Sequence, residues 1–508
     1  MSYSHGLVDG LTAALCYRWV GLAMRRLKLE GIRAIHLLNG RPSGSGGQGR
    51  PFLDGIENVG EETVSPCSPE EEAALVRKVD LMLLPTMWIM YLLSYMDRTN
   101  IGNAKISGMQ EDLNLTSDQY SICLVVFFIG YVVLEVPSNL ILSRTRPSLF
   151  LPGIMVVWGT LTCVMGVVKD FKHLVVLRTL IGCVESGFAP GILLVISSWY
   201  KKTEQSKRFG VYISAAVLSG AFGGLIAAGI VSGLEGAHGI RGWRWLFIVE
   251  GAVTVGFALI SLFILPDFPA TTKRLSERER HVAIARLESD NVTAMTADGE
   301  RLSSWQAILG SVKDWRTWMF VIGYMVIVGA STLSYFYPTL VKGLFGDAST
   351  TRINFLTIPI YAVAFVCTGI TAYFSDKIPL WRGVVIAAWL AFSLACSVAV
   401  CAVYNYSARY ALLVLMAAGL WATNGGTLAY ASSAFADMQP QVRGVSLALV
   451  NALGNLAQIY GSYLFPDSDG PKYIMGFAVI SAMLAVGVIV FLILHIWIRR
   501  TAKSTARQ

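Results

Sequence analysis

Ionisable side chains inside strongly apolar segments are the residues of this sequence that could do chemistry. The stretch SYMDRTNIGNAK, residues 94–105, follows the apolar run LMLLPTMWIMYLL and carries Asp97, Arg98 and Asn100. A charged group at the centre of a membrane-spanning helix costs about 2.5–3.5 kcal/mol on insertion scales, so it persists only where it is paired or used. The other such residues in the first half of the chain are Glu135, Arg178, Glu185 and Glu250.

Arg178 and Glu185 stand seven residues apart in VVLRTLIGCVESGFAPG. Seven residues are close to two helical turns, so both side chains are expected on one helix face. Gly182 lies between them on that face, where a small residue lets a neighbouring helix approach closely. Asp97 and Arg98 are consecutive and diverge by about 100° around their own helix. We therefore expect two carboxylates and two guanidiniums to converge from the first and fourth apolar segments.

Such a cluster can couple a proton to an anion. Exclusion of water favours the protonated form of Asp97 or Glu185, while a nearby arginine favours the ionised form. Arg98 stays charged and can grip a carboxylate through two parallel hydrogen bonds. An anion bound there would draw off part of the field of Arg98 and favour protonation of the acid. The alternative is that these residues form buried salt bridges that only fix helix packing. The candidate proton-coupling residues are Asp97, Glu185 and Arg178.

The second half of the chain offers amides in place of charges. Asn424 lies in LWATNGGTLAYASS, and Asn451, Asn455 and Gln458 recur at i, i+4 and i+7, which places these three on one helical stripe. The stripe either binds substrate or forms an interhelical hydrogen-bond seam, worth about 0.6 kcal/mol per contact. Charge on one half and amides on the other would suit a polar organic acid. The candidate substrate-binding residues are Arg98, Asn100, Asn424, Asn451 and Asn455.

Two further acids have other expected roles. Glu135, in FFIGYVVLEVPSNLILSR, is expected to brace a gate near Arg144 and Arg146 rather than to bind substrate. Glu250, in GWRWLFIVEGAV, fits a packing role and a place in the cavity equally well.

The composition excludes a soluble globular protein. The chain has 508 residues, of which 54% are hydrophobic and 15% charged, with a mean hydropathy of +0.55, whereas soluble domains carry about 25% charged residues. The eight cysteines show neither a disulfide framework nor metal-ligand spacing. The net charge of +8 comes from short basic clusters between apolar runs, which argues for positive loops at a membrane and against nucleic-acid binding.

Apolar stretches of about 20 residues, the length that crosses a bilayer core, occur twelve times, six on each side of a charged stretch. We predict an all-α membrane protein with twelve transmembrane helices in two six-helix bundles, the plan of many secondary transporters. The predicted spans are 81–103, 119–141, 149–168, 174–198, 209–233, 244–265, 317–340, 352–374, 383–404, 409–433, 443–465 and 473–497. The predicted regions are an extension (1–75), a first bundle (76–266), a central loop with an amphipathic helix (267–315), a second bundle (316–498) and a tail (499–508).

Charge and sequence signals give the expected orientation. Basic residues before the first span, after the last and in the central loop predict that both termini are cytoplasmic. The sequons at Asn114 and Asn405 then fall in outer loops as candidate glycosylation sites. The pattern SPEEEAALVRKVD, residues 68–80, predicts a Ser-x-x-Glu cap on a short helix leading into the first span. Residues 1–75 contain a flexible linker by composition, and their earlier part is expected to be a dispensable extension.

These motifs resemble the major facilitator superfamily, and within it the anion:cation symporters, in particular the fungal allantoate and nicotinate permease group. The resemblance runs from about residue 80 to 497 and rests on YLLSYMDRTNIGNAK, FFIGYVVLEVPSNLIL, LRTLIGCVESGFAPG, GWRWLFIVEG and IYGSYLFPDSDGPKY. It implies alternating access by two bundles and import of small organic anions with protons. In related bacterial sugar-acid symporters the acids matching Asp97 and Glu185 carry the proton cycle, the arginine matching Arg98 engages the substrate carboxylate, and Arg178 looks like the paired arginine.

Departures from the superfamily pattern also carry information. SRTRPSLF, after the second span, follows the gating loop Gly-x-x-x-Asp-Arg-x-Gly-Arg-Arg only loosely, whereas GITAYFSDKIPLWRG keeps it better and makes Asp376 and Arg382 candidate gating residues. The segment LSGAFGGLIAAG lacks the Gly-Pro pair usual in drug/proton antiporters, which argues against multidrug export.

The expected function is proton-coupled uptake of a small carboxylate, with no cofactor or metal, by a monomer in the plasma membrane. The alternatives are export of a secondary metabolite, which the same fold permits, and a non-transporting nutrient receptor, which would not need titratable pairs. An enzyme is not expected, because the spans show no metal cluster, nucleophile elbow or paired histidines.

Overall fold

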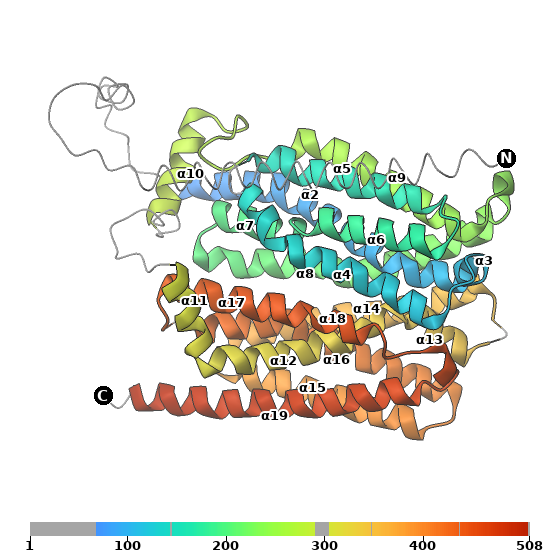
Figure 1. Cartoon of the computed structure of the whole chain (residues 1–508). Coiled ribbons are helices and arrows are strands. Elements are labelled where there is room, and N and C mark those ends of the chain that lie inside the picture. The colour runs from blue at the N-terminus through green and yellow to red at the C-terminus, as the bar shows by residue number, and fades with distance from the viewer. Residues whose placement is uncertain (1–67, 143–144, 290–303, 347, 436, 506–508) are drawn as a thin grey trace. The chain divides into compact units, whose positions relative to one another are not determined.

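The structure is a computed structural model that describes residues 68–142, 145–289, 304–346, 348–435 and 437–505. The secondary structure within these ranges is helical, as Figure 1 shows. Bilayer hydrocarbon offers the backbone no hydrogen-bond partner, so a spanning segment must satisfy its own peptide groups, as a helix does. The predicted all-helical class is confirmed.

The first bundle contains the helices that precede the central loop. A π-helical turn, Lys105–Met109, and the short α3, Gln110–Asp112, continue α2, and a 3₁₀ turn, Ala237–Gly239, precedes α9. The main helices are α2 Pro69–Ala104, α4 Ser117–Leu142, α5 Pro147–Met165, α6 Phe171–Glu185, α7 Phe188–Trp199, α8 Lys202–Leu234 and α9 Gly242–Ile264.

The second bundle follows α10, Glu277–Ser289, and α11, Ser304–Lys313. Short 3₁₀ turns lie at Thr332–Tyr335, Pro379–Trp381 and Asp467–Asp469. The main helices are α12 Trp315–Ser331, α13 Tyr337–Leu344, α14 Thr350–Lys377, α15 Arg382–Ala402, α16 Tyr406–Ala434, α17 Pro440–Asn455, α18 Ala457–Gly461 and α19 Ile474–Thr505.

Eleven helical segments within the described ranges are long and apolar enough to cross a membrane, and each matches one predicted span. The remaining predicted span, 443–465, is divided between α17 and α18. At the division, Ile459 N donates to the Leu456 carbonyl, so an i→i+3 bond replaces the helical i→i+4 pattern. The expectation of one continuous stripe through Asn451, Asn455 and Gln458 is therefore wrong, because Asn455 ends one helix and Gln458 belongs to the next.

Local capping determines where several helices begin. Ser68 Oγ accepts from Glu71 N (3.1 Å), and Glu71 accepts from Ser68 N (3.2 Å), which confirms the predicted capping box. The helix does not stop before the first span, however, because α2 continues without a break through Pro85. Asp314 and Asn405 likewise cap α12 and α16 with side-chain oxygens.

The amphipathic helix predicted in the central loop is α10. Val282, Ala283 and Leu287 are buried on one of its faces. Lys78 on α2 donates to Glu279 on α10 (2.7 Å), and this hydrogen bond lowers the pKa of Glu279 below its ordinary value. The central loop is thus attached to the start of the first bundle at this helix.

The two bundles meet along α4 and α8 of the first and α14, α17 and α18 of the second (Figure 1). Gly220 on α8 shows how close this approach is, since an added Cβ would overlap the ring of Tyr361 on α14. Within the first bundle, a Cβ on Gly182 would overlap the Phe127 carbonyl on α4. The predicted close approach of a helix at Gly182 is therefore confirmed, and it brings α6 and its charged face against α4.

Candidate functional site

An ion pair between α2 and α6 lies at the centre of the candidate site. Arg98 Nε donates to Oε1 of Glu185 (2.7 Å), and Ser94 Oγ donates to the same oxygen. Ser94 precedes Arg98 by one helical turn, so both reach Glu185 from one face of α2. Arg98 is 7% exposed and Glu185 is fully buried. The first and fourth predicted spans thus supply one guanidinium and one carboxylate in direct contact.

Asp97 faces other helices. Its Oδ2 accepts from Trp158 Nε1 on α5 (3.1 Å) and from Thr254 Oγ1 on α9 (3.0 Å). The two consecutive residues Asp97 and Arg98 thus diverge around α2, as their spacing predicts. The partners of Asp97 are neutral, so no cation within the described residues bonds this buried acid directly to balance an ionised carboxylate.

Arg178 lies in the same region but bonds a different group. Its Nε donates to the carbonyl of Cys123 on α4 (3.3 Å), and its guanidinium carbon lies 4.8 Å from the ring centre of Phe127. The guanidinium carbon of Arg98 lies 5.4 Å from the same ring, so the two cations share an aromatic neighbour. Seven residues rise about 10.5 Å along a helix, which is why Arg178 and Glu185 can share a face without a direct bond.

Aromatic rings enclose the Arg98 guanidinium. Its carbon lies 4.8 Å from the ring centre of Tyr131 and 5.0 Å from that of Tyr95. A partly desolvated guanidinium over a ring gains on the order of 2 kcal/mol. These contacts hold the cation in place while leaving its nitrogens able to donate hydrogen bonds.

Several buried polar atoms of α2 and α6, including two of the ion pair itself, lack a hydrogen-bond partner within the described part of the chain. They are Arg98 Nη2, Glu185 Oε2, Asp97 Oδ1 and both amide atoms of Asn100. Buried polar groups are normally satisfied by protein or water. This region therefore combines unused donors and acceptors of both charge types, which is the inventory that a polar ligand or water would need.

Asn451 and Asn424, predicted in the second bundle, bond different partners. Asn451 Nδ2 on α17 donates to Oε1 of Glu135 on α4 (3.3 Å), which is a contact between the two bundles. Asn424 Oδ1 on α16 accepts from the Tyr324 hydroxyl (3.3 Å), within the second bundle. Asn455 is half-buried at the end of α17. Glu135 therefore joins the bundles through an amide.

The remaining candidate gating residues lie at helix ends. Arg146 is exposed immediately before α5, and Arg144 is outside the described residues. Arg382 starts α15 and donates to the Ser375 carbonyl and to Ser433 Oγ, both at 3.4 Å, so it links three helices. Asp376 falls near the end of α14, and its side chain is also outside the described part.

Both sequons are exposed on turns. Asn114 has a positive φ of 47° in the turn between α3 and α4. Asn405 precedes α16 and its Oδ1 accepts from Ala408 N (3.1 Å). This cap uses the amide oxygen and leaves the amide nitrogen, where a glycan would attach, pointing away from the bond.

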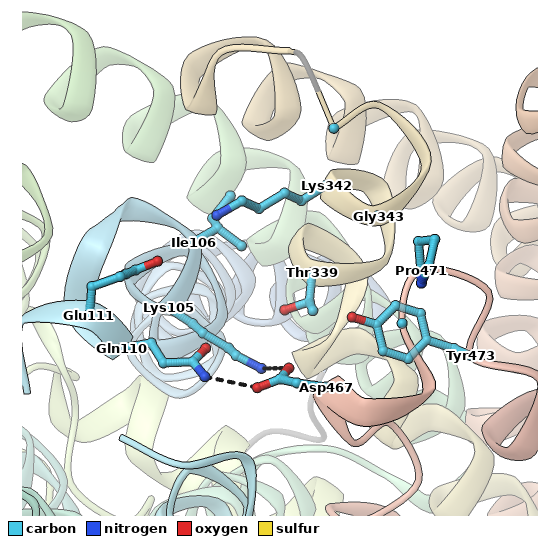
Figure 2. Close-up of a pocket in the computed structure, with 12 residues that line it drawn as sticks. Lys105, Ile106, Gln110, Glu111, Thr339, Lys342, Gly343, Asp467, Pro471 and Tyr473 are labelled. Atoms are coloured by element: carbon cyan, nitrogen blue, oxygen red, sulfur yellow. Dashed lines mark hydrogen bonds and ion pairs between the residues drawn. The ribbon is translucent and has the colours of Figure 1, made fainter. Parts of the chain in front are cut away.

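Sequence reasoning missed a second contact between the bundles, shown in Figure 2. Asp467, in the turn after α18, accepts from Lys105 Nζ and from Gln110 Nε2, both at 2.8 Å, and its backbone nitrogen donates to Ser117 Oγ at 3.0 Å. We call these four residues the Asp467 latch. It borders a pocket of about 520 Å³ that Thr339 and Lys342 of the second bundle also line. The partners are separated by hundreds of residues, so no local signal could have paired them.

The other missed partners are those of the two acids. Ser94 could have been found, because it lies four residues before Arg98 and therefore on the same helix face. Trp158 and Thr254 bond Asp97 from helices that are far away in sequence, and an isolated tryptophan or threonine in an apolar span carries no signal of such a role.

Comparisons with known proteins agree with this architecture. The profile of the Major Facilitator Superfamily matches residues 87–462. A fungal protein named MFS transporter prlL is 34% identical over 80% of this chain and 82% of its own length. The high-affinity nicotinic acid transporter of Saccharomyces cerevisiae is 27% identical over 82% of this chain and 76% of its own length.

Solved structures agree at the level of the fold. A bacterial homologue of the human lysosomal transporter Spinster, solved in an inward-facing and unoccupied conformation, superposes with a TM-score of 0.64 at 16% identity, over 86% of this chain and 99% of that one. The family profile covers well over half of this chain. Eleven helices within the described residues of the chain have the length and apolar composition of membrane spans. This multi-pass membrane protein belongs to the Major Facilitator Superfamily.

Proposed function

We propose that this transporter carries a small organic anion together with protons by alternating access. The observation that carries the proposal is the buried Arg98–Glu185 pair, in which Nη2 of the guanidinium and Oε2 of the carboxylate remain unbonded. A pair that served packing alone would be expected to satisfy these atoms, because an unsatisfied buried charge is costly. The unbonded atoms supply one donor to an anion and one acceptor to a proton.

Anion binding follows from the chemistry of Arg98. A carboxylate that approaches Nη2 meets a permanently charged donor in an aromatic surrounding, where charge-assisted hydrogen bonds are about twice as strong as neutral ones. Asn100 lies two residues further along α2, so its buried amide points about 200° away from Arg98 around the helix and can contact the substrate only from another side. The substrate class that fits Arg98 is a small carboxylate.

Proton coupling follows from competition for the same cation. Glu185 accepts hydrogen bonds from Arg98 and Ser94. When a substrate carboxylate takes part of the Arg98 charge, Glu185 loses stabilisation of its ionised form and binds a proton more readily. Loss of that proton on the other side of the membrane restores the Arg98–Glu185 pair and releases the anion. Substrate and proton thereby favour each other's binding, as linkage requires.

Alternating access requires that the bundles separate at one end at a time. The Asp467 latch and the Glu135–Asn451 contact are two connections between bundles that such a motion would break. Both consist of a few polar contacts, which in the latch include the Lys105–Asp467 ion pair and the bond from the Asp467 backbone nitrogen to Ser117. The hinge motion therefore needs to exchange a few polar contacts with water, which is compatible with a reversible transition.

The proposal extends to direction and substrate. The first substrate to test is nicotinate, because a similar protein is named a nicotinic acid transporter. Cytoplasmic termini, a plasma-membrane location and a monomeric carrier complete the proposal, and the basic residues at the chain ends support this orientation.

The test is uptake by purified protein in liposomes under an imposed pH gradient. Labelled nicotinate, allantoate, pantothenate, biotin and sugar acids are offered in turn, with and without a proton ionophore. We expect one of these anions to accumulate when the outside is acidic and to stop accumulating when the ionophore is added. Accumulation that ignores the ionophore would contradict proton coupling.

The same preparation separates import from export. Protein labelled at one terminus shows its orientation by protease accessibility, so the direction of the driving gradient can be assigned to a face of the molecule. Accumulation that needs protons on the face bearing the termini would assign export. Empty liposomes and liposomes carrying heat-denatured protein are the controls for passive diffusion of the protonated acid.

A further inference from the structure

Glu250 is a buried acid that the mechanism above does not use. It lies on α9, is 3% exposed, and neither of its carboxylate oxygens has a hydrogen-bond partner within the described residues. Burying an ionised carboxylate without a partner is costly even after the surroundings relax, and such a group normally neutralises instead. The geometry around Glu250 is therefore that of a carboxyl group that holds a proton.

The neighbour that gives this proton a role is Asp97. Thr254 lies one turn after Glu250 on α9 and so on the same helix face. Its hydroxyl donates to Oδ2 of Asp97 (3.0 Å), while Oδ1 of Asp97 is buried and unbonded. Asp97 is also the charged group whose field acts on Glu250. Asp97 on α2 and Glu250 on α9 thus border the contact between these two helices, and three of their four carboxylate oxygens have no hydrogen-bond partner within the described residues.

Other titratable groups near α9 do not neutralise this pair. Cys163 on α5 adjoins Gly251 and donates its thiol to the Ile248 carbonyl at 3.5 Å. Tyr212 on α8 stacks on Tyr91, with ring centres 3.9 Å apart.

Two cations on elements that pack against α9 bond other acids. Lys105, in the π-helical turn that packs on α9, bonds Asp467, and Arg208 on α8 bonds Asp80. The charges that reach Asp97 from α6 are those of Glu185 and Arg178, one of each sign. Two ionised carboxylates here would consequently repel each other without a bonded cation between them.

We propose that Asp97 and Glu250 form one proton-binding unit that carries at most one negative charge, with Glu250 as a further proton-carrying residue of the transport cycle. Adding a proton to either carboxylate forms one O–H bond, and releasing it to water or to the other carboxylate breaks that bond, so charge is conserved at each step. The transport role rests on the proposed proton coupling, whereas the proton occupancy of Glu250 does not.

The occupancy is measured by infrared spectroscopy of purified protein in lipid, with the pH varied and carboxylic C=O absorption followed. The wild-type protein is expected to show protonated carboxyl absorption that persists above neutral pH, and Glu250→Gln is expected to lose one carboxyl equivalent of it. Glu277→Gln is the matched control, because Glu277 is an exposed acid on α10 and should contribute nothing to this absorption. An unchanged spectrum in Glu250→Gln would overturn the proposal.

A second variant keeps the test informative if Glu250→Gln does not fold. Asp97→Asn removes the negative neighbour, so Glu250 should ionise more readily and its carboxyl absorption should titrate at lower pH than in wild type. Coupled acids titrate in separate steps when they interact by more than about one pH unit, so a shift of about one unit is expected. A midpoint that stays in place would show that the two acids do not form a unit.

Transport supplies the last readout. The pH profile of uptake by Glu250→Gln should move by about one unit, because Asp97 would then titrate alone and no longer as one of two coupled acids. Glu250→Asp, which keeps the acid, should restore the profile. An unmoved profile in a variant that has lost the absorption would overturn the transport role. If wild-type uptake ignores the pH gradient, proton coupling itself fails, and the infrared result still decides whether Glu250 holds a proton.

Discussion

The two bundles bury different kinds of polar group. Within the described residues, the first bundle buries six acidic or basic side chains that are each no more than 7% exposed: Asp97, Arg98, Lys105, Arg178, Glu185 and Glu250. The interior of the second holds mainly hydroxyls and amides, including Asn354, Thr357, Ser393, Ser397, Thr423, Thr427 and Ser446. Its buried arginines, Arg316 and Arg409, lie in the first turns of α12 and α16, where Arg316 pairs with Asp314 and Asp437 and Arg409 donates to the Lys472 carbonyl.

This difference teaches how binding and motion can be divided between the halves. Charged groups respond to protons and to the charge of a substrate, but they are costly to bury and must be held in a fixed arrangement. Neutral groups can change partners with little penalty, since each hydrogen bond is worth only about 0.5–1.5 kcal/mol net. We infer that the first bundle senses charge and protons, while the second supplies shape and exchangeable hydrogen bonds.

The largest effect is expected from neutralising Glu185 in the first bundle. Glu185→Gln keeps an acceptor for Ser94 and Arg98 but cannot exchange a proton, so gradient-driven accumulation should fall by about 5–150-fold, the range of typical coupling energies. Exchange of labelled for unlabelled substrate across the membrane should persist. Uptake and exchange are measured in the same liposomes, and uphill uptake at the wild-type level would remove Glu185 from the coupling step.

The next largest effect is expected from changing the shape of the Arg98 side chain while keeping its charge. Arg98→Lys retains the positive charge and can still pair with Glu185, but it loses the planar fork that donates two parallel hydrogen bonds. Loss of one charge-assisted bond costs about 1.5–3 kcal/mol, so the Kd for substrate should rise by about 10–100-fold. Binding is measured by calorimetry on detergent-solubilised protein. An unaltered Kd would place the substrate carboxylate elsewhere.

A smaller effect is expected from removing an amide in the second bundle. Asn424→Ala removes one amide contact, worth about 0.5–1.5 kcal/mol, and should weaken substrate binding by about 2–10-fold without changing its pH dependence. Tyr324→Phe is the matched control, because it removes the hydroxyl that Asn424 accepts from while keeping the amide. If both variants lower the melting temperature and leave Kd unchanged, Asn424 belongs to a packing seam and not to the substrate site.

The smallest effect is expected from varying the pH at the Asp467 latch, because its contacts should persist over the physiological range. Burial alone would raise the pKa of Asp467, but the ammonium of Lys105, the hydrogen bonds from Lys105 and Gln110 and the charge of Lys342 together lower it below 3.8. A lowered pKa means that the stabilisation is complete above the ordinary value and is lost as the pH falls through the lowered one. The latch should therefore stay closed at physiological pH.

The closed state of the latch is measured by hydrogen exchange of the Asp467–Asp469 turn, with the rates corrected for the intrinsic pH dependence of exchange. Protection should be constant between about pH 5 and pH 8, where a free carboxylate is also ionised, and should fall only below the ordinary pKa. Asp467→Asn should reduce protection at every pH, since Lys105 would lose its anionic partner. A loss of wild-type protection near neutral pH would show that the latch is itself a pH-sensitive element. That result would contradict the inference that proton sensing belongs to the interior of the first bundle.

The helices could be predicted from the sequence because their signals are local. Apolar length, the Ser68 cap and the charged linker located the spans, although α2 begins at Pro69, before the predicted start at residue 81, and α19 continues to Thr505, beyond the predicted end at residue 497. The prediction failed at residues 455–459, where the chain changes from i→i+4 to i→i+3 bonding next to Gly454, whose added Cβ would overlap Tyr324. That interruption depends on a neighbouring helix, which the local pattern does not reveal.

The sequence by itself determined which half of this protein carries ionisable groups, because the cost of placing a charge in an apolar segment is evident wherever one occurs. It also determined which residues share a helix face. Only the tertiary structure decided the partners: Glu185 with Arg98, Asp97 with Trp158 and Thr254, Glu135 with Asn451, and Asp467 with Lys105. These pairings join helices that are distant along the chain, so they follow from how the helices pack and from no pattern within any one of them.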